Sequence, residues 1–304
     1  MKIAFIGLGQ MGKPMALNML ERDPALIVYA ADQSSYPEFQ RRGARPAERL
    51  ADVAAADLIF LSLPSTEVVQ DVLFGTGGLA AVLLPGRIVV DTSTIDYSAT
   101  VEIAAQLAAK GVTFVDAPVS GMEARAIEGT LTAMCGGAAD VLDTVEPYLS
   151  AVANNILRMG DVGAGQLTKL INQVLFDINA AALAEVLPMA VRLGLDPEKV
   201  GNVVNSGTGR SYASEFFIPR ILKGDFSSGY PMQHAYKDLA SAAEIGARRC
   251  VPMPVLAAST ATYQMALLKG LGKLDKGAMV RVYEELNEVV FRASPMLEKQ
   301  TAEA

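Results

Sequence analysis

Apolar residues in the first half of the chain occur in short, nearly continuous runs. Those rich in Val, Ile, Leu or Phe and bounded by Gly, Pro or polar turns predict β-strands: KIAFIG, LIVYA, DLIFLSL, RIVVDTS and VTFVDAP. Such runs are typical of strands buried on both faces of a parallel sheet. Amphipathic stretches such as PMALNMLERD and ATVEIAAQLAAKG lie between them and predict helices. Strand and helix in turn predict a doubly wound α/β domain.

The pattern changes near residue 162. From Gln166 onward helical runs dominate, with stops at LGLDPEK, NSGTGRS, KGDFSSGYP, CVPMP and KGLGKLDKG. Asp196 followed by Pro197 predicts a helix start, because Asp caps free backbone amides and Pro is favoured at the first helical position. A length of 304 residues also suits two domains. We therefore predict an α/β domain over 1–162 and an all-helical domain over 163–304.

Composition and charge narrow the possible partners and compartments. Hydrophobic residues make up 51% and charged residues 19%, so the chain can bury large cores. The formal charge of −7 argues against nucleic acid and acidic membranes as partners. The apolar segment 180–195 contains Glu185, Pro188 and Arg192, which favours a core helix over a membrane span. Met1 and Lys2 run directly into a strand without a signal peptide, so we expect a cytoplasmic protein.

The cysteine and histidine content leaves few options for metal or nucleophilic chemistry. Cys135 and Cys250 are the only cysteines and cannot make a disulfide framework. His234 is the only histidine, so neither a zinc site of usual composition nor a Ser/His/Asp triad is expected. We predict no metal site.

A glycine-rich turn, GLGQMG, follows the first predicted strand and opens the first helix. Gly7 permits a tight turn, Gly9 lets the backbone approach a pyrophosphate, and Gly12 lets the helix pack on the strand. The alternative is a glycine turn without a ligand. Its position within a βαβ unit favours dinucleotide binding by the whole turn: Gly7, Leu8, Gly9, Gln10, Met11 and Gly12.

The end of the second predicted strand bears on the choice between NAD and NADP. Asp32 lies about 20 positions beyond the fingerprint, where a carboxylate accepts the ribose hydroxyls of NAD. No Arg occupies that turn to bind a 2′-phosphate, although Arg41 and Arg42 follow. We predict NAD, with NADP possible; the alternative for Asp32 is an ordinary turn residue.

Further polar residues lie where the carboxyl ends of parallel strands should meet, in LSLPS, DTSTID and DAPVSGMEARAIEGTL. Ser120 and Gly121 offer a hydroxyl and backbone amides suited to a carboxylate, and Thr94 could line a nicotinamide pocket. Each has an alternative in plain turn chemistry.

The stretch GAGQLTKLINQ places Lys169, Asn172 and Gln173 at positions i, i+3 and i+4, on one helix face. Either that face meets water, the commoner fate of a lysine, or it meets a group that needs an ammonium and two amides.

These residues carry a family resemblance. The motifs FIGLGQMGKPMA, VVDTSTID, DAPVSG…AIEGTLTAMCGG, GAGQLTKLINQ and YKDLASA resemble those of the β-hydroxyacid dehydrogenase family, in family order over nearly all of the chain. That family includes 3-hydroxyisobutyrate dehydrogenase and tartronate semialdehyde reductase. The resemblance implies an N-terminal Rossmann domain and an all-α C-terminal domain that binds substrate and supports dimerisation.

The resemblance also implies site roles. Lys169 is expected to be the catalytic acid/base, with a pKa lowered by burial and a nearby nicotinamide. Asn172 or Gln173 would bond the reacting oxygen or the carboxylate. The other implied contacts are Ser120, Gly121, Met122, Tyr230 and Asp238 for substrate, and Leu63, Pro64, Thr94 and Lys237 for cofactor.

The chain departs from the family pattern at several positions. Met122 stands where the family usually has a second Gly, so a thioether narrows the pocket or makes it more apolar. Several members have Asn in place of Gln173. The ribose-binding Asp of many members aligns with Ala30 and not with Asp32, which weakens the preference for NAD. Arg210 is a candidate second clamp for a carboxylate or phosphate, or a surface loop residue.

The leading hypothesis is a hydride transfer between NAD(P) and a small 3-hydroxy acid or its semialdehyde. The runner-up is an aldehyde reductase for succinic semialdehyde or glyoxylate. A third is a non-catalytic dinucleotide-binding module, which an intact Lys169 disfavours. Imine-reducing relatives are disfavoured because they tend to lack this lysine. The apolar helical domain also predicts a homodimer or homotetramer.

Overall fold

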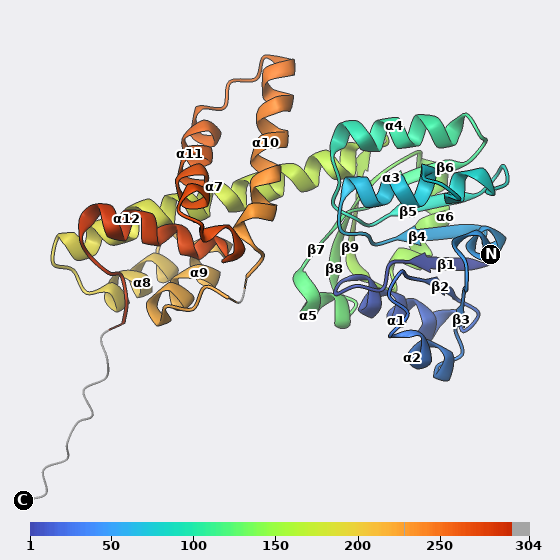
Figure 1. Cartoon of the computed structure of the whole chain (residues 1–304), viewed down its shortest axis with the longest axis horizontal. Helices are drawn as coiled ribbons and strands as arrows, with labels where there is room; N and C mark the ends of the chain where they lie inside the picture. The colour runs from blue at the N-terminus through green and yellow to red at the C-terminus, as the bar shows by residue number, and fades with distance from the viewer. Residues whose placement is uncertain (228, 294–304) are drawn as a thin grey trace, which may run out of the picture. The chain divides into compact units, whose positions relative to one another are not determined.

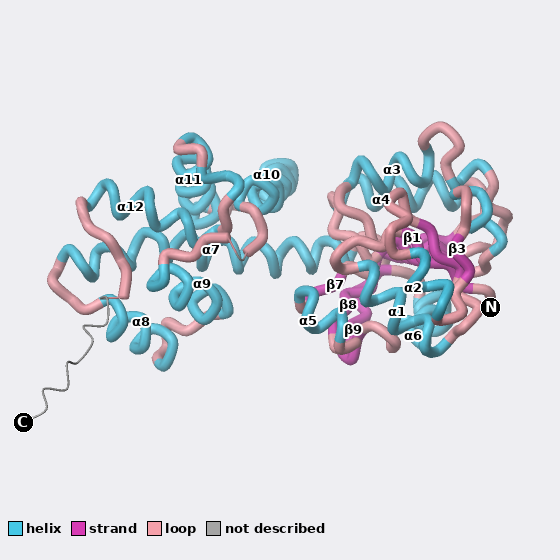
Figure 2. Tube along the Cα trace, turned by 60° about the horizontal axis from the view of Figure 1, so that its bottom comes forward, coloured by secondary structure: helices cyan, strands magenta, loops and turns pink. Residues whose placement is uncertain are grey.

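The computed structural model describes residues 1–227 and 229–293. It divides into two compact units, Met1–Lys169 and Leu170–Ala304. All the strands lie in the first unit, and the described part of the second is built from helices and loops (Figure 2). The α/β and all-helical fold classes predicted from the sequence are therefore confirmed.

The first unit contains a nine-stranded sheet in the order β3-β2-β1-β4-β5-β6-β8-β7, with β9 beside β8. The stretch from β3 to β6 is parallel throughout. β8 runs antiparallel to β6 and β7 but parallel to β9. The strands are β1 (Ile3–Ile6), β2 (Ile27–Tyr29), β3 (Arg45–Pro46), β4 (Leu58–Leu61), β5 (Ile88–Asp91), β6 (Thr113–Asp116), β7 (Val119–Ser120), β8 (Leu131–Gly136) and β9 (Ala153–Gly160).

Helices cover both faces of this sheet, with α3 and α4 on one side and α1, α2 and α6 on the other (Figure 1). Ile3 and Phe5 of β1 point into one hydrophobic cluster, whereas Ala4 and Ile6 point into the other, as the two-residue period of a strand requires. The helices are α1 (Gly12–Arg22), α2 (Tyr36–Arg41), α3 (Thr66–Phe74), α4 (Tyr97–Ala108), α5 (Met122–Ile127) and α6 (Ala139–Leu149), with 3₁₀ turns η1 (Leu50–Ala55) and η2 (Leu79–Ala81).

The helices of the second unit end at the breaks that the sequence predicted. Asp196 caps α8 by accepting a bond from the Lys199 amide at 2.9 Å, with Pro197 at the first helical position, as predicted. The helix α7 begins within the first unit and continues into the second. The helices are α7 (Ala164–Arg192), α8 (Pro197–Ser206), α9 (Tyr212–Lys223), α10 (Met232–Arg249), α11 (Pro254–Leu268) and α12 (Val280–Asn287), with 3₁₀ turns η3 (Leu271–Lys273) and η4 (Lys276–Met279).

A buried ion pair ties α7 to the rest of the second unit. Lys276 of η4 binds the carboxylate of Asp177, and both side chains are almost fully buried. The same ammonium lies 4.3 Å from the centre of the Phe176 ring. Separating the two side chains would leave each charge buried without its partner, which is strongly unfavourable. The ion pair therefore holds α7 in one position against η4.

Candidate active site

The carboxyl ends of β1, β4, β5 and β6 lie at one edge of the sheet, because these strands are parallel and adjacent. Backbone bonds continue the ladder past the strand ends: the amides of Ser62, Thr92 and Ala117 donate to Ile6, Leu61 and Asp91 at 2.9, 2.8 and 2.7 Å. The loops that follow these strands are therefore held side by side. This edge is where open α/β sheets bind ligands.

The glycine turn between β1 and α1 has the geometry that a pyrophosphate requires. Gly7 has φ +97°, and a Cβ there would lie 2.2 Å from the Ser62 carbonyl oxygen. A Cβ at Gly12 would lie 2.0 Å from the Gly7 oxygen, so the helix start packs directly on the turn. At Gly9 a Cβ would meet no atom within 4 Å, which leaves open space beside the backbone. The turn therefore fits the diphosphate of a dinucleotide.

The segment that carries Ser120 lies next to this turn. The Gln10 amide donates to the Glu123 carboxylate at 2.8 Å, and Asn18 of α1 donates to the Ala126 carbonyl at 2.8 Å. These bonds fasten α5 to α1. Two segments more than a hundred residues apart in the sequence, both predicted to bind ligands, are thus brought together in the first unit.

Residues 120–122 form a sharp turn with strained backbone. Gly121 has φ +143° and Met122 has φ +63°, a left-handed conformation that costs a non-glycine residue about 1 kcal/mol. Met122 is 47% exposed. Glycine would adopt this positive φ without strain, and strain of this kind tends to persist at functional sites.

The loops after β4 and β5 are joined by hydrogen bonds. The Leu63 amide donates to Ser93 Oγ at 2.8 Å, and the Ser93 amide donates to Asp91 Oδ1 at 2.9 Å. Thr94 follows Ser93 and is partly buried, whereas Pro64 is exposed. The residues predicted to contact the cofactor from these loops therefore belong to one connected frame.

Lys169 is only 7% exposed, which is unusual for a lysine. The start of its helix is anchored to the strand edge: Asp116 Oδ1 accepts from the Gly163 amide at 2.7 Å, and Oδ2 accepts from the Gln166 amide at 2.8 Å. Free amides at a helix N-terminus are a favourable partner for a carboxylate. The anchor places Lys169 one turn further along α7. Of the two environments considered for Lys169 from the sequence, water or a ligand, the burial of its side chain disfavours water.

Two carboxyl groups, Asp91 and Asp116, are paired in register at the ends of β5 and β6 and are both fully buried. Burial raises the pKa of Asp91 to about 6, and Asp116 adds to the shift. Burial also raises the pKa of Asp116, against the lowering effect of the Gly163 and Gln166 amides. Asp91 Oδ2 has no hydrogen-bond partner among the described residues, so the ionised form of this group is costly.

Asp32 lies in the loop after β2 and forms a local turn. Its two oxygens accept bonds from the amide and hydroxyl of Ser34, each at 2.9 Å, and these bonds lower the pKa of Asp32. Ala30, directly after the same strand, is buried. Ribose binding by Asp32 therefore stays a prediction beside its alternative as a turn residue.

The remaining predicted residues belong to the second unit. The Asn172 amide donates to Gln173 Oε1 at 3.3 Å on α7. Lys237 is exposed and Asp238 is buried on α10. Partial burial and the carboxylates of Asp238 and Asp177 raise the pKa of Tyr230, which places Tyr230 in the same neighbourhood. Their roles at the site stay predictions.

Arg210 lies between α8 and α9 and forms an ion pair with Glu215 at 2.6 Å. Both side chains are largely exposed. This geometry matches a surface loop arginine, which was one of the two interpretations of the sequence.

Several polar residues of this edge were not identified from the sequence: Asp91, Ser93, Asp116 and Gln166. A signal was present, because VVDTS and FVDAP each place an Asp at the end of a predicted strand. The bonds by which Asp116 and the Ser93 carbonyl hold the start of α7 depend on the sheet order, which brings β5 beside β6.

Comparisons with known proteins agree with this geometry. Residues 2–160 match the family described as the NAD binding domain of 6-phosphogluconate dehydrogenase. Residues 163–283 match the family described as NAD-binding of NADP-dependent 3-hydroxyisobutyrate dehydrogenase. Together the two matches span most of the chain.

Individual relatives cover nearly the full length. The chain is 39% identical to 2-(hydroxymethyl)glutarate dehydrogenase of Eubacterium barkeri, over 95% of this chain and 96% of that protein. It is 36% identical to 3-sulfolactaldehyde reductase of Escherichia coli, over 91% and 94% of the two chains. The structure of Mycobacterium tuberculosis 3-hydroxyisobutyrate dehydrogenase with L-serine superposes with a TM-score of 0.82 at 27% identity, covering 92% of this chain and 98% of that one.

The chain belongs to the β-hydroxyacid dehydrogenase family. It is an NAD(P)-dependent oxidoreductase, and the small hydroxy acids and semialdehydes of this family are its class of substrate. The resemblance drawn from the motifs is confirmed.

Asp91 predicts a pH-dependent stability. A folded-state pKa of about 6, above the ordinary 3.8, means that the folded protein keeps a proton that the unfolded chain has lost. Stability should therefore fall as pH rises from about 3 to about 7, by about 3 kcal/mol in all and by about 1 kcal/mol between pH 5 and pH 7. Asp91→Asn should remove this contribution, measured as the difference from wild type in urea denaturation across that range.

Glu21→Gln, the same carboxylate-to-amide change at an exposed position of α1, is the control and should keep the wild-type pH dependence. An Asp91→Asn variant whose stability falls with pH as steeply as the wild type would contradict the prediction.

Proposed function

We propose that the protein interconverts a small 3-hydroxy acid and its semialdehyde, with Lys169 as the general acid/base. The observation that carries this proposal is the burial of Lys169 on a helix turn anchored to the cofactor edge of the same unit. A side chain held in place at the edge where open α/β sheets bind ligands can exchange a proton with a substrate alcohol. The intact lysine also counts against a non-catalytic binding module.

The proposed chemistry is a balanced transfer of a hydride and a proton. When bound, NAD(P)⁺ supplies the hydride acceptor at nicotinamide C4. The neutral Lys169 amine takes the hydroxyl proton as the carbinol C–H bond breaks and the C=O bond forms. In the reverse direction the Lys169 ammonium returns the proton to the carbonyl oxygen.

The other side chains would orient the substrate. Ser120 and the backbone amides of Gly121 and Met122 would bind the acid group, since the positive φ angles make a turn with closely spaced N–H groups. Asn172 or Gln173, one turn beyond Lys169 along α7, would donate a hydrogen bond to the reacting oxygen or to the carboxylate. Tyr230 and Asp238 would shape the pocket, and Lys237 would contact the cofactor.

The relatives support an acid with a nearby alcohol or aldehyde. By their names, one acts on 2-(hydroxymethyl)glutarate, which is a 3-hydroxy acid, and a structural neighbour was studied with L-serine, also a 3-hydroxy acid. The second candidate is an aldehyde reductase for other small acid aldehydes, such as succinic semialdehyde or glyoxylate. The similarity to 3-sulfolactaldehyde reductase favours it. For the cofactor we propose NAD, on the position of Asp32, and for the compartment the cytoplasm.

We also propose that the chain forms a homodimer or homotetramer through one face of α7. This apolar stripe is made of large side chains at helical spacing that are 50–70% exposed: Ile171, Leu175, Val186 and Met189 of α7, and Leu193 directly after it. Exposed apolar surface of this extent marks an association site, and a second copy of the chain offers the same apolar face in return.

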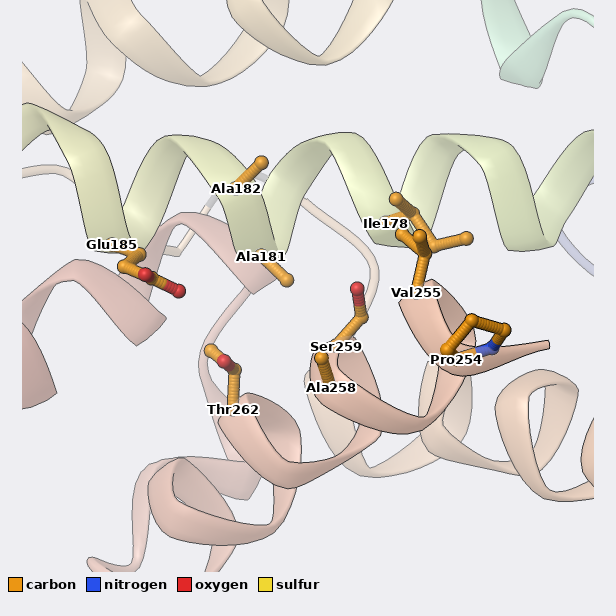
Figure 3. A pocket seen from close by; sticks show the side chains of 9 residues that line it. All are labelled: Ile178, Ala181, Ala182, Glu185, Pro254, Val255, Ala258, Ser259 and Thr262. Carbon is orange, nitrogen blue, oxygen red and sulfur yellow. The ribbon is translucent and has the colours of Figure 1, made fainter.

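A pocket of about 350 Å³ between α7 and α11 adjoins this stripe. Ile178 and Ala181 of α7 point toward Val255 and Ser259 of α11 across it (Figure 3). Its walls are mostly small apolar side chains. The pocket therefore extends the apolar stripe and suits a side chain from a second copy.

Replacing Lys169 tests the acid/base role. Lys169→Ala should lower kcat by about 10²–10⁴-fold, because the proton has no acceptor at the reacting oxygen. Folding and NAD(P) binding, measured by thermal melting and cofactor fluorescence, should change little. Lys110→Ala, an exposed lysine of the same unit, should keep full activity. Retention of more than about a tenth of wild-type kcat by Lys169→Ala would refute the role.

A substrate panel tests the reaction class. We expect NAD(P)-linked turnover of three- to five-carbon 3-hydroxy acids, with kcat/KM at least about tenfold above that for succinic semialdehyde or glyoxylate. Spectrophotometric assays with both nicotinamides measure this. The reverse order would favour the aldehyde reductase, and no turnover of any member would exclude both.

Met189→Lys tests the association face. A lysine within the apolar stripe should shift the protein toward the 32.1 kDa monomer in light scattering coupled to size exclusion. Val203→Lys, at an exposed apolar position on α8, should keep the wild-type mass. Wild-type protein that elutes as a monomer would contradict the proposal.

A further inference from the structure

We propose that Gln166 is a positioning residue for the reaction, because its side-chain amide fixes the loop carrying Thr94 relative to the helix carrying Lys169. The inference rests on the proposed function, in which Lys169 moves the proton and Thr94 contacts the cofactor. Gln166 is only 2% exposed, so its amide needs partners inside the protein. Those partners define its role.

The amide makes two hydrogen bonds that flank Thr94. Gln166 Nε2 donates to the Ser93 carbonyl at 2.7 Å, and Gln166 Oε1 accepts from the Ile95 amide at 3.2 Å. One planar group thus holds the backbone on both sides of Thr94. The Thr94 backbone cannot shift without breaking a buried bond.

The same loop is tied to the neighbouring strand end. Ser93 Oγ accepts from the Leu63 amide at 2.8 Å, and the Ser93 amide donates to Asp91 at 2.9 Å. Leu63 and Thr94, both predicted to contact the cofactor, therefore move as one frame. Gln166 connects this frame to α7.

The backbone of Gln166 is also held in place. The Gln166 backbone amide donates to Asp116 Oδ2 at 2.8 Å. Lys169 lies three residues further along α7, and residues at this spacing are neighbours on adjacent turns of a helix. The relative position of Lys169 and Thr94 is thus set through one residue. Small displacements of a reacting group can cost about 10²-fold in rate.

The chemistry of the position requires both a donor and an acceptor. Met has a similar length but makes neither bond. An ionised Glu offers two acceptors and would face the Ser93 carbonyl oxygen with like polarity. A protonated Glu carries one O–H donor and one acceptor, so it can make both bonds again.

The test compares Q166M and Q166E in the full-length enzyme. Q166M should lower kcat by about 10–100-fold while the Kd for the dinucleotide stays within about threefold of wild type. Q166E should be as impaired at pH 8 but should recover as its buried carboxyl takes up a proton, so the Q166E to Q166M ratio of kcat/KM should rise at least about tenfold by pH 6. Q106M makes the same change at an exposed position of α4 and should keep wild-type kinetics.

A merely structural role would lower the melting temperature of both variants and leave their activity ratio independent of pH, and that result would overturn the proposal. If Q166M does not fold, the ratio of Q166E to wild type over the same pH range is the readout. Lys169→Ala separates the two proposals. An inactive Lys169→Ala beside a fully active Q166M overturns only the positioning role, whereas an active Lys169→Ala overturns the proposed function.

Discussion

The start of α7 depends on one buried carboxylate. Asp116 binds two amides at the helix N-terminus, and the glycines around it leave no room for other side chains: a Cβ at Gly165 would lie 2.2 Å from the Met134 carbonyl oxygen. Close approach and charge therefore fix the helix against β6 and β8. Lys169 lies three residues beyond Gln166 on the same helix, so its backbone takes its position from this contact.

Much of the fold could be predicted from the sequence because its signals are local. Five of the parallel strands are recognisable as apolar runs. Asp196 and Pro197 mark a helix start through capping, which depends only on neighbouring residues. The strands β3, β7, β8 and β9 were not predicted. β3 has two residues, and most of β9 is exposed, so neither carries the apolar run of a buried strand. The antiparallel pairing of β8 with β6 joins segments that are distant in the sequence, so no local pattern indicates it.

Only part of the candidate site could be predicted from the sequence. The glycine turn has a spacing with a direct physical meaning, and its geometry follows: Gly7 takes a positive φ while Gly9 borders open space. The catalytic role predicted for Lys169 rests on the order of the family motifs along the chain and not on the residues next to it. Gln166 could not be found in this way, because its partners Ser93 and Ile95 are more than 70 residues away and meet it only through the sheet order.

The left-handed backbone at Met122 limits which residues can follow Gly121. Branching at Cβ is poorly tolerated at positive φ, so Val, Ile and Thr are disfavoured there whatever space surrounds the side chain. Gly, Asn and Asp are the residues best able to adopt this conformation. Substitution at position 122 is thus confined to unbranched side chains, short polar side chains or glycine.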